Sequence, residues 1–452
     1  MTTTADVIVL GVGPGGEDAA GSLAEAGLEV VAVDDRLVGG ECPYWGCVPS
    51  KTMIRAANLL AEARRVNGMA GSATVQPDWA PVARRVREMT GNWDDRTAVE
   101  RLENRGARLV RGHGRLDGPR AVVVGAERIE ARRAILVNIG TGAWLPPVPG
   151  LEETAYWTNR QAIEADHLPR SLVVLGGGAV AVELAQMFAR FGVQVSVVEV
   201  APRLIPLEEP EASDLLSKVF AAEHIAVHTG AKIISAHTDD DEVVLDLEGP
   251  GPVRGERLLV AAGRRPDLAA LGAATIGMDE GARALPTDEH MRVTDGVWAI
   301  GDVAGRGAFT HMSAYEATIA VNDILGRAGQ GAEYHAVPRV TFTDPEIGCV
   351  GLTEEQAHGA DVIVRTALSP LPESARGWIH GPGNDGFIKL VEDAERGVLV
   401  GATSAGPSGG EVLSMLTLAV HARIPTHELR RMIFAYPTFH RAIEPALDAL
   451  RQ

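Results

Sequence analysis

Residues 6–16, DVIVLGVGPGG, decide the fold of the N-terminal part of this chain. A short apolar run, typical of a buried strand, leads into a turn in which Gly11, Gly13 and Gly16 fit the pattern G-x-G-x-x-G. An alanine-rich stretch and a second apolar run follow, and Asp34 ends that run. This order is typical of a Rossmann-like dinucleotide site. The glycines admit a pyrophosphate to the helix N-terminus, and the carboxylate can accept hydrogen bonds from a ribose.

The same pattern occurs again at residues 172–199. Here Gly176, Gly178 and Ala181 fit G-x-G-x-x-A after an apolar run, and Glu199 takes the place of the acid. An ordinary strand-to-helix turn would explain either loop by itself, but two full copies with acids at matching places favour two nucleotide sites. Two such sites in one chain suggest a flavoprotein in which FAD takes up hydride from a nicotinamide.

The acid of the second copy bears on the choice between NADH and NADPH. Glu199 can hydrogen-bond the 2′-hydroxyl of the adenosine ribose and would repel a 2′-phosphate, so NADH is favoured. Arg203 lies four residues further on and could soften this preference.

Other glycine-containing stretches follow apolar runs and extend the two predicted sites. We assign Gly142, Gly301 and Asp302 to FAD binding, with the carboxylate of Asp302 placed to bind a polyol or a second ribose, and Gly263 to NAD binding. These residues lie in ILVNIGTGAWLPPVPG (135–150), LLVAAGRRPD (258–267) and GVWAIGDVAG (296–305).

Length and composition narrow the class of protein. A chain of 452 residues is long enough for roughly three domains. The formal net charge of −18 argues against nucleic acid or an anionic membrane as a partner. The chain has no apolar run long enough to span a bilayer and no signal-peptide pattern. Three cysteines do not make a secreted disulfide scaffold, so we expect a reducing, cytoplasmic location.

The order of motifs resembles the pyridine nucleotide-disulfide oxidoreductases of the dihydrolipoamide dehydrogenase, glutathione reductase and mercuric reductase group. The resemblance implies an α/β fold with two Rossmann-like domains, for FAD and NAD(P), and a C-terminal α+β domain that forms a homodimer. It implies an FAD domain at 1–150 and 276–333, an NAD(P) domain at 151–275 and an interface domain at 334–452. The motifs are GVGPGG, GGECPYWGCVPSK, GGGAVAVELA, AAGRRPD, VWAIGDVAG, TFTDPEIGCVGLTEEQA and, imperfectly, YPTFHR.

The stretch GGECPYWGCVPSK (39–51) holds Cys42 and Cys47. Residues i and i+5 of a regular helix are too far apart for a disulfide, so a distortion or a position before the helix is needed. We expect Pro43 at the first helical position, which makes Cys42 the N-cap, and slack at Gly46. A thiol at a helix N-terminus has a lowered pKa, as thiol exchange requires. A redox pair is favoured over half of a metal site or simple packing.

The resemblance also implies roles for individual residues. Cys47 would be the thiol that touches the flavin, and Cys42 the outer thiol that attacks the acceptor. Lys51 matches the family lysine near the flavin N5 edge, and Glu183 matches its partner. A solvated helix lysine is the simpler alternative for Lys51.

The C-terminal motif departs from the family pattern H-P-T-x-x-E. Tyr436 replaces the histidine base that the partner subunit supplies, and Arg441 replaces the glutamate. With a reference pKa near 10, tyrosine is a poor base at neutral pH. His440 could act instead, although it sits one residue from the glutamate position and could equally be a surface residue.

These observations predict an FAD-dependent NAD(P)H oxidoreductase that passes electrons through a Cys42–Cys47 disulfide to a small-molecule acceptor such as a disulfide or a quinone. The alternative is a diaphorase, quinone reductase or transhydrogenase-like flavoprotein that does not need the disulfide. Minor alternatives are metal reduction of the mercuric reductase kind, the ketone-thioether carboxylase branch and a non-catalytic flavin-binding scaffold. No metal site is predicted.

Overall fold

The structure is a computed structural model that describes residues 2–249 and 251–451. The chain forms two compact units, each built from three separate stretches. The first unit comprises Met1–Ser50, Arg84–Trp144 and Gly263–Glu333, and the second comprises Lys51–Ala83, Leu145–Ala262 and Tyr334–Gln452. Each unit is described here by itself.

The first unit contains a sheet with the strand order β17-β18-β6-β1-β2-β3, to which β4 and β5 add an antiparallel extension at β6. The pairs from β18 to β3 are parallel, as in a Rossmann-like sheet, and β17 is antiparallel to β18. The strands are β1 (Thr2–Leu10), β2 (Val30–Asp34), β3 (Arg108–Arg111), β4 (Gly114–Leu116), β5 (Ala121–Val124), β6 (Glu127–Val137), β17 (Arg292–Thr294) and β18 (Val297–Ala299).

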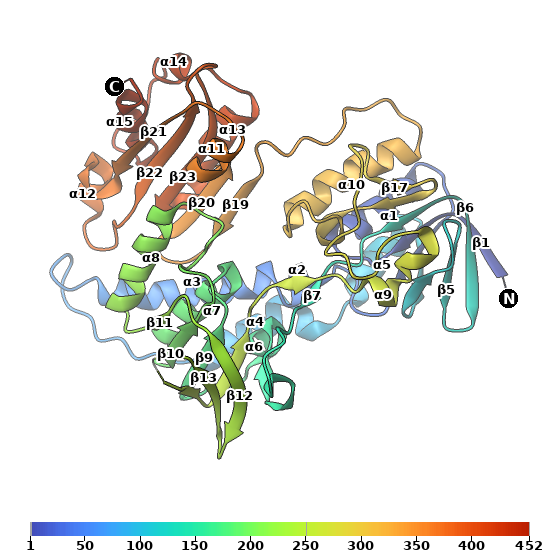
Figure 1. Ribbon diagram of the computed structural model, residues 1–452, viewed down its shortest axis with the longest axis horizontal. Helices are drawn as coiled ribbons and strands as arrows, with labels where there is room; N and C mark the ends of the chain where they lie inside the picture. Colours follow the sequence, from blue (N-terminus) through green and yellow to red (C-terminus); the bar gives the residue numbers. More distant parts are fainter. Residues whose placement is uncertain (1, 250, 452) are drawn as a thin grey trace. The chain divides into compact units, whose positions relative to one another are not determined.

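Helices α1 (Pro14–Glu25) and α10 (Thr310–Ile324) pack against each other in this unit (Figure 1). Pro14 opens α1, where its missing N–H and fixed φ suit the first helical turn. A side chain on Gly15 would overlap Ser313, so glycine lets the two helices approach. Further elements are α2 (Glu41–Tyr44), α5 (Arg96–Asn104), α9 (Leu268–Leu271), β7 (Gly142–Ala143), β16 (Arg264–Arg265), η1 (Gly91–Trp93), η3 (Ala273–Ile276) and η4 (Gly301–Ala304).

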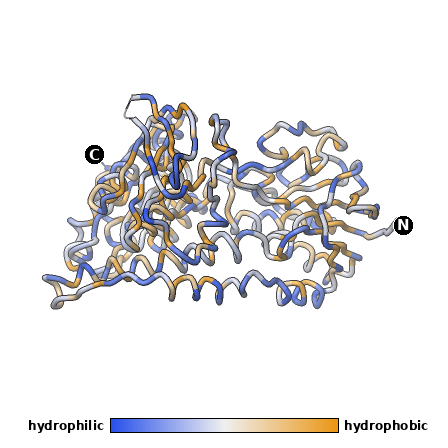
Figure 2. Tube along the Cα trace, turned by 90° about the horizontal axis from the view of Figure 1, so that it is seen from below, coloured by the Kyte–Doolittle hydropathy of each residue, from blue (hydrophilic) through white to orange (hydrophobic). Residues whose placement is uncertain are grey.

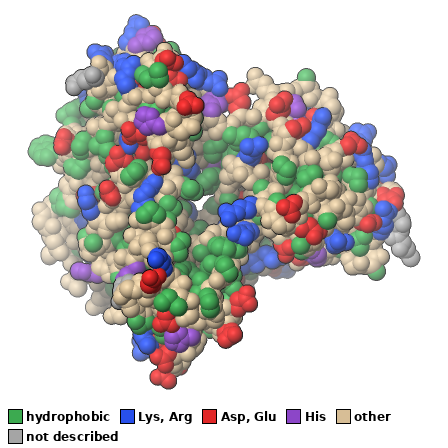
Figure 3. Space-filling view, in the orientation of Figure 1, with side chains coloured by type: hydrophobic (Ala, Val, Ile, Leu, Met, Phe, Trp, Pro, Cys, Tyr) green, Lys and Arg blue, Asp and Glu red, His purple; other side chains and the backbone are tan. Residues whose placement is uncertain are grey.

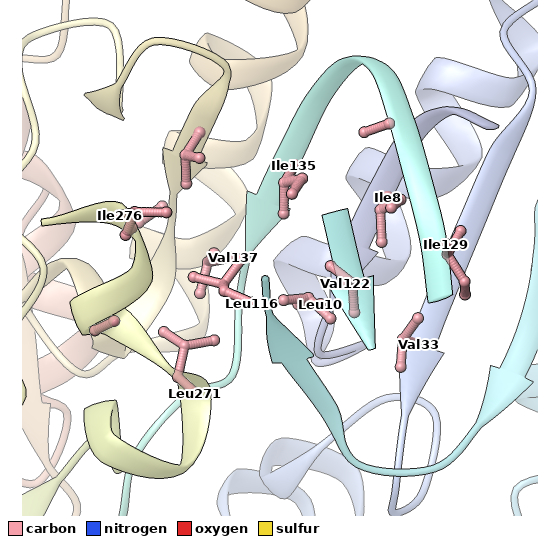
Figure 4. Close-up of a cluster of buried hydrophobic side chains, with 14 of the residues drawn as sticks. Ile8, Leu10, Val33, Leu116, Val122, Ile129, Ile135, Val137, Leu271 and Ile276 are labelled. Atoms are coloured by element: carbon pink, nitrogen blue, oxygen red, sulfur yellow. The ribbon is translucent and has the colours of Figure 1, made fainter. Parts of the chain in front are cut away.

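The core of the first unit lies on the sheet and combines strands that are distant in sequence (Figure 4). Ile8, Ile135 and Val297 are fully buried, and they come from β1, β6 and β18. The apolar runs that end β1 (residues 7–10) and β6 (residues 134–137) fit strand ends that are covered on both faces. Leu268, Leu271 and Ile276 pack on the same cluster. The sheet edge formed by residues 292–299 therefore depends on the core built by the first 137 residues.

The second unit contains a parallel sheet with the order β11-β10-β9-β15-β8 and a small antiparallel sheet, β12-β13-β14. Helix α7 (Ala179–Arg190) packs on β9 and β10. The remaining elements are β8 (Tyr156–Trp157), β9 (Ser171–Leu175), β10 (Gln194–Val198), β11 (Ala226–His228), β12 (Ile233–Asp239), β13 (Glu242–Leu247), β14 (Val253–Gly255), β15 (Arg257–Val260), α6 (Asn159–Glu164), α8 (Pro210–Ala222) and η2 (Leu151–Glu153).

The C-terminal part of the second unit is an antiparallel sheet, β19-β20-β23-β22-β21, with α13 packed on β20 and β23 and α15 on β21. The elements are β19 (Pro338–Thr341), β20 (Glu346–Gly351), β21 (Val364–Pro370), β22 (Phe387–Asp393), β23 (Val398–Gly406), α11 (Glu354–Gly359), α12 (Ala375–His380), α13 (Gly409–His421), α14 (Thr426–Leu429), α15 (Ile443–Ala449), η5 (Leu371–Glu373) and η6 (Phe439–Ala442). Helices α3 (Cys47–Arg64) and α4 (Ala80–Met89) belong to both units.

A buried lysine joins two parts of the second unit. Lys389, on β22, is 4% exposed and its Nζ lies 3.0 Å from Glu209 and 2.8 Å from both Glu211 and Glu354. Burial by itself would lower the pKa of Lys389, but its hydrogen bonds to these carboxylates outweigh burial and raise the pKa. This paired cation fastens the start of α8 to β22.

Within residues 2–249 and 251–451, every helix is too short or too polar to cross a membrane, and Figure 2 shows polar residues interspersed along the chain. On the face drawn in Figure 3, acidic and basic side chains are intermixed. The predicted α/β fold, with two Rossmann-like sheets and a C-terminal α+β region, is confirmed.

Candidate active site

The first glycine loop joins β1 to α1. Gly11 has φ +88°, and a Cβ there would overlap the backbone of Asn138, so both its conformation and its neighbours require glycine. Gly13 is the N-cap of α1, and a Cβ on Gly16 would overlap the carbonyl oxygen of Gly11. The loop is therefore packed closely on itself and against Asn138, which directly follows β6.

The carboxylate of Asp34, at the end of β2, is bound by the backbone of the same loop. It accepts hydrogen bonds from Val12 N (2.6 Å) and from Arg36 N (2.8 Å). Burial raises the pKa of Asp34, and these two hydrogen bonds oppose that effect only in part. Asp34 thus lies beside the glycine loop, as a ribose-binding acid requires.

The second glycine loop, between β9 and α7, repeats this geometry. Gly176 has φ +116°, and Ala181 is fully buried on α7. Glu199, directly after β10, is 8% exposed and accepts hydrogen bonds from Gly177 N and from Ala201 N (2.6 Å). A Cβ on Gly178 would meet no atom within 4 Å, so the loop backbone there adjoins open space.

The hydrogen bonds of the Arg203 side chain are made with its own loop and not with Glu199. Its guanidinium donates to the carbonyl oxygens of Glu208 (2.7 Å) and Pro206 (2.8 Å), within its own loop. Those donors would have to leave the loop backbone before they could bind a 2′-phosphate. The arrangement therefore supports the predicted preference for NADH.

Asn138 connects the first glycine loop to the segment that begins at Gly301. Its backbone N–H donates to Leu10 O (2.6 Å), and its side-chain amide lies 3.1 Å from the hydroxyl of Ser313. A Cβ on Gly301 would lie 2.8 Å from that hydroxyl oxygen and 2.9 Å from the amide of Asn138. Gly11 and Gly16 of the first loop and the distant Gly301, all predicted as FAD-binding residues, therefore meet Asn138.

Asp302, another predicted FAD-binding residue, is linked through hydrogen bonds to two further polar side chains. Its Oδ2 accepts a hydrogen bond from the hydroxyl of Thr141 (2.7 Å), and Arg264 Nε donates to that hydroxyl oxygen (3.0 Å). A Cβ on Gly142 or Gly263 would meet no atom within 4 Å. Gly263, predicted for NAD binding, begins the last stretch of the first unit, where its carbonyl accepts a hydrogen bond from Trp144 N, and its role stays a prediction.

The cysteine segment starts against the first glycine loop. Gly39 N donates to Val12 O (2.7 Å), and a Cβ on Gly40 would lie 2.8 Å from the Cα of Gly13. Helix α2 then carries Cys42, and α3 begins at Cys47. The close approach at Gly40 therefore places the cysteines next to the predicted pyrophosphate loop.

The prediction that Cys42 caps a helix begun by Pro43 is wrong. The N-cap is Gly40, whose φ of +66° suits glycine, and α2 begins at Glu41. Pro43 falls at the third helical position, where a missing N–H costs little because the first helical N–H groups have no intrahelical partner. Gly46 permits a close approach of the two cysteine helices, because a Cβ there would lie 3.2 Å from the Cα of Cys42.

The two cysteines are in the thiol form and interact with each other. The hydrogen bond with Cys47 and then burial raise the pKa of Cys42, whereas a hydrogen bond with Thr310 lowers it. Cys47 is exposed, and its Sγ lies 3.6 Å from Thr310 Oγ1. The expectation of a lowered pKa therefore fails for Cys42, which keeps its proton beside Cys47.

Aromatic residues brace the segment between the cysteines. Tyr44 is 6% exposed, and its hydroxyl donates to Val38 O (3.1 Å). Trp93 Nε1 donates to Tyr44 O (3.2 Å), and the rings of Tyr44 and Trp45 are 5.9 Å apart. Tyr44 thus packs as part of the scaffold, while Trp45 stays partly exposed beside the thiols.

Lys51 and Glu183 meet in the second unit. Lys51 Nζ lies 2.7 Å from Glu183 Oε2 and 4.8 Å from the ring centroid of Phe342, whose N–H donates to Glu183 Oε1 (2.8 Å). Glu183 is 5% exposed, and the side chain of Lys51 is 34% exposed. The alternative of a solvated helix lysine does not describe this pair, although its predicted part in the reaction remains a prediction.

The residues in place of the family His-Glu pair lie at the end of the second unit. Tyr436 is 68% exposed, with the guanidinium carbon of Arg441 5.3 Å from its ring centroid. Arg441 pairs with Glu444 (3.1 Å). His440 is partly exposed in η6. Arg441 therefore lies over the ring of an exposed tyrosine.

The two loops fit dinucleotides. At each one, a parallel strand ends in glycines, the next helix begins directly after them, and an acid is fixed beside the turn by a loop amide. The open space at Gly178 leaves room for a pyrophosphate. Among the residues that the structure describes, His, Cys, Asp and Glu side chains form no group of three or more placed to hold a metal ion.

The sequence did not reveal every residue of this region. Asn138 and Thr310 meet the predicted glycines and cysteines, but neither belongs to a recognisable motif in the primary structure. Asn138 follows β6 in the run VNIGTG, a place typical of loop residues near a nucleotide. Thr310 carries no comparable signal.

Comparison with known proteins agrees with this geometry. The pyridine nucleotide-disulphide oxidoreductase family matches residues 5–318, and the dimerisation domain of that family matches residues 337–447. A dihydrolipoyl dehydrogenase of Chlorobaculum tepidum is 32% identical, covering 99% of this chain and 97% of that protein. A mercuric reductase of Bacillus cereus is 30% identical, covering 98% of this chain and 71% of that protein.

Solved structures show the same fold over nearly the whole chain. LpdA from Mycobacterium tuberculosis has a TM-score of 0.86 with 26% identity, covering 99% of each chain. The flavoprotein disulfide reductase RclA from Escherichia coli has a TM-score of 0.87 with 24% identity, also covering 99% of each chain, and at that identity it supports the fold alone. The predicted cofactors, FAD and NAD(P)H, are those of the family, and the prediction of an enzyme is confirmed. The chain therefore belongs to the pyridine nucleotide-disulphide oxidoreductase family.

Proposed function

We propose that this protein is an NADH-dependent flavoprotein that reduces a small disulfide through Cys42 and Cys47. When bound, FAD supplies two-electron chemistry between the nicotinamide and the cysteine pair. The carrying observation is the pairing of the two thiols beside the first glycine loop, with Gly40 against Gly13 and Gly46 against Cys42. The close approach of Gly46 to Cys42 keeps the two ends of the cysteine segment near each other, as a disulfide that forms and opens requires.

The two cysteines are the only redox groups that the exchange with the acceptor needs for its electrons and protons to balance. Cys42 attacks an acceptor disulfide RSSR, forms a mixed disulfide and releases one RSH. Cys47 then attacks the sulfur of Cys42, so that the Cys42–Cys47 disulfide forms and the second RSH leaves. The acceptor gains two electrons and two protons, and the dithiol becomes a disulfide.

Cys42 must lose its proton before it attacks, and its pKa is raised by Cys47 and by burial. A general base is therefore needed in the exchange step. We infer a homodimer, as the dimerisation domain supports, in which Tyr436 and His440 of one subunit approach the thiols of the other. His440 is the candidate base, and Tyr436 is a hydrogen-bonding group for the acceptor.

The remaining predicted residues fit the same scheme. We infer that Lys51, held by Glu183 and the ring of Phe342, takes the part of the family lysine in the reaction. Glu199 selects NADH because its carboxylate, fixed by two amides, would face a 2′-phosphate. Asp34 and Asp302 serve the hydroxyl groups of FAD.

The predicted domain limits remain a proposal: FAD segments at 1–150 and 276–333, an NAD segment at 151–275 and an interface domain at 334–452, with Met1, Pro250 and Gln452 outside the described residues. The separate family match to 337–447 supports a C-terminal interface domain. The cytoplasmic location also remains a prediction.

A second candidate function is quinone or dye reduction directly from the flavin. The replacement of the family histidine by the exposed Tyr436 favours it, because that change weakens thiol exchange. In this case Cys42 and Cys47 would be bystanders.

One experiment separates the two. The purified holoenzyme is titrated anaerobically with NADH, and free thiols are counted in the wild type, Cys42→Ser and the control Cys349→Ala, which alters a buried cysteine on β20. We expect two new thiols per chain in the wild type and the control, and a loss of disulfide reduction in Cys42→Ser. A constant thiol count with full quinone reduction in Cys42→Ser would instead establish the second function.

A further inference from the structure

Thr310 is the first residue of α10 and lies at the cysteine pair, although 263 positions separate it from Cys47 in sequence. Its Oγ1 is 3.6 Å from Cys47 Sγ, within the range of a hydrogen bond to sulfur. The same hydroxyl also lowers the pKa of Cys42. One side chain from a distant helix therefore contacts Cys47 and acts on the Cys42 thiol.

A threonine hydroxyl can donate one hydrogen bond and accept two. Beside a thiol and a thiolate, it can accept from the protonated sulfur and donate to the charged one at the same time. A carbonyl could only accept, and an ammonium could only donate. The hydroxyl suits both states of a pair whose charge moves between two sulfurs during exchange.

We propose that Thr310 is a positioning residue that holds the reduced Cys42–Cys47 pair and donates its hydrogen bond to whichever sulfur carries the negative charge. This inference rests on the proposed function, since it concerns the same thiols. The direction of the effect on Cys42 agrees, because the Thr310 hydrogen bond lowers the pKa of Cys42 against the larger effects of Cys47 and burial.

The backbone around Thr310 explains why its position is well defined. The residue follows Phe309, whose carbonyl accepts from Met312 N (3.0 Å) and Ser313 N (3.2 Å) in the first turn of α10. The rings of Phe309 and His311 stack at 5.2 Å on either side of it in sequence. The hydroxyl is thus carried by the closed first turn of α10.

The test uses the holoenzyme reduced with a phosphine. Iodoacetamide alkylation rates of Cys42 and Cys47 are measured from pH 6 to 10 by mass spectrometry of the cysteine peptide. The variants are Thr310→Val, which keeps the shape without the hydroxyl, and Thr310→Ser, which restores it. Thr318→Val is the control, because Thr318 lies on the same helix and its hydroxyl bonds only to the helix carbonyl of Ala314 (3.2 Å) among the hydrogen bonds described.

In Thr310→Val we expect the first thiol ionisation to move up by about one pH unit, so that alkylation at pH 7 falls about tenfold. Thr310→Ser and Thr318→Val should stay within about twofold of the wild type at that pH. Rates in Thr310→Val within twofold of the wild type would overturn the proposal, and so would an equal fall in Thr318→Val. If Thr310→Val does not fold, Thr310→Ala is judged by the same criteria.

The alkylation rates are measured without turnover, so the proposal for Thr310 can fail independently of the proposed function. A constant thiol count during NADH titration would remove the cysteines from the electron path while the alkylation rates still report on Thr310. Two new thiols per chain together with unchanged rates in Thr310→Val would support the function and overturn the role of Thr310.

Discussion

The two glycine loops of this chain are each bound to an acidic residue by matching hydrogen bonds. In each, the residue after the first glycine donates its N–H to the acid at the end of the next strand: Val12 to Asp34, and Gly177 to Glu199. In each, the acid also accepts from the residue two places further on, Arg36 or Ala201. The acid therefore fixes the loop before any nucleotide binds, with one amide on each side of the carboxylate.

The loops differ at the third position of the motif. A Cβ on Gly16 would overlap Gly11 O, whereas Ala181 carries a real Cβ and is fully buried without such an overlap. In the first loop α1 also meets α10 closely, at Gly15 and Ser313. The residue at the third position of the motif thus depends on how tightly the helix packs on the turn. The glycine at the middle position is the one that we expect to give the ligand access to the backbone.

The largest effect is expected at the crowded position. Gly16→Ala should lower the free energy of unfolding by about 3 kcal/mol, because the new methyl overlaps backbone that cannot move aside. Ala181→Gly, the matched change in the second loop, should cost about 1 kcal/mol through helix propensity. Denaturant unfolding of both variants measures this, and equal losses would contradict the difference between the loops.

The next effect concerns ligand approach at the second loop. Gly178→Ala adds a methyl to open space, so unfolding should change by about 1 kcal/mol or less, while the KM for NADH should rise about tenfold. Gly359→Ala, which also adds a methyl to open space at the end of α11, is the control. An unchanged KM in Gly178→Ala would mean that the nucleotide approaches elsewhere.

The acid of the second loop should set the nucleotide preference. Glu199→Gln keeps an acceptor for one amide but removes the negative charge, so the ratio of kcat/KM for NADH to that for NADPH should fall about tenfold. Arg203→Ala should leave the ratio within about twofold, since that guanidinium is bound to Pro206 and Glu208 carbonyls. Steady-state kinetics with both nucleotides decide this.

The smallest effect is the pH dependence of the first loop. Because burial raises the pKa of Asp34, this carboxyl takes up its proton at a higher pH than an exposed aspartate. The protonated acid is a weaker acceptor, so the Kd for FAD should rise about threefold from pH 7 to pH 5, with little change in Asp34→Asn. Fluorescence titration of the apoprotein measures both.

The raised pKa of Asp34 affects the stability of the fold in the opposite direction to the affinity for FAD. A carboxyl with a raised pKa binds protons more readily in the folded chain than in the unfolded chain, so its contribution to stability grows as pH falls. Weaker FAD binding at pH 5 accompanied by unfolding would therefore have another cause than Asp34.

The sequence predicted those parts that depend on local order. Both glycine loops and both acids come from continuous segments, and each acid accepts a hydrogen bond from its own loop. Their roles in binding stay predictions. The predicted start of α2 was wrong. The prediction relied on Pro43, whereas the helix is capped by Gly40, which can adopt the positive φ needed there.

Asn138 and Thr310 could not be predicted, since their neighbours are set by tertiary packing. Asn138 reaches the first loop because β6 pairs with β1, and Thr310 reaches the thiols from the first turn of α10. Pairing between distant strands and helix approach leave no local pattern in the primary structure.

The position of β18 in the first sheet has a consequence for synthesis on the ribosome. β18 pairs with residues 135–137 of β6, yet about 160 residues separate the two strands, and that interval contains the whole second parallel sheet. At about 5–20 residues per second, translation takes roughly 8 to 32 seconds to cross it. During this time the nascent chain carries an open strand edge, a template for wrong pairing. The inserted sheet therefore emerges and can fold while the sheet that precedes it waits for its last strands.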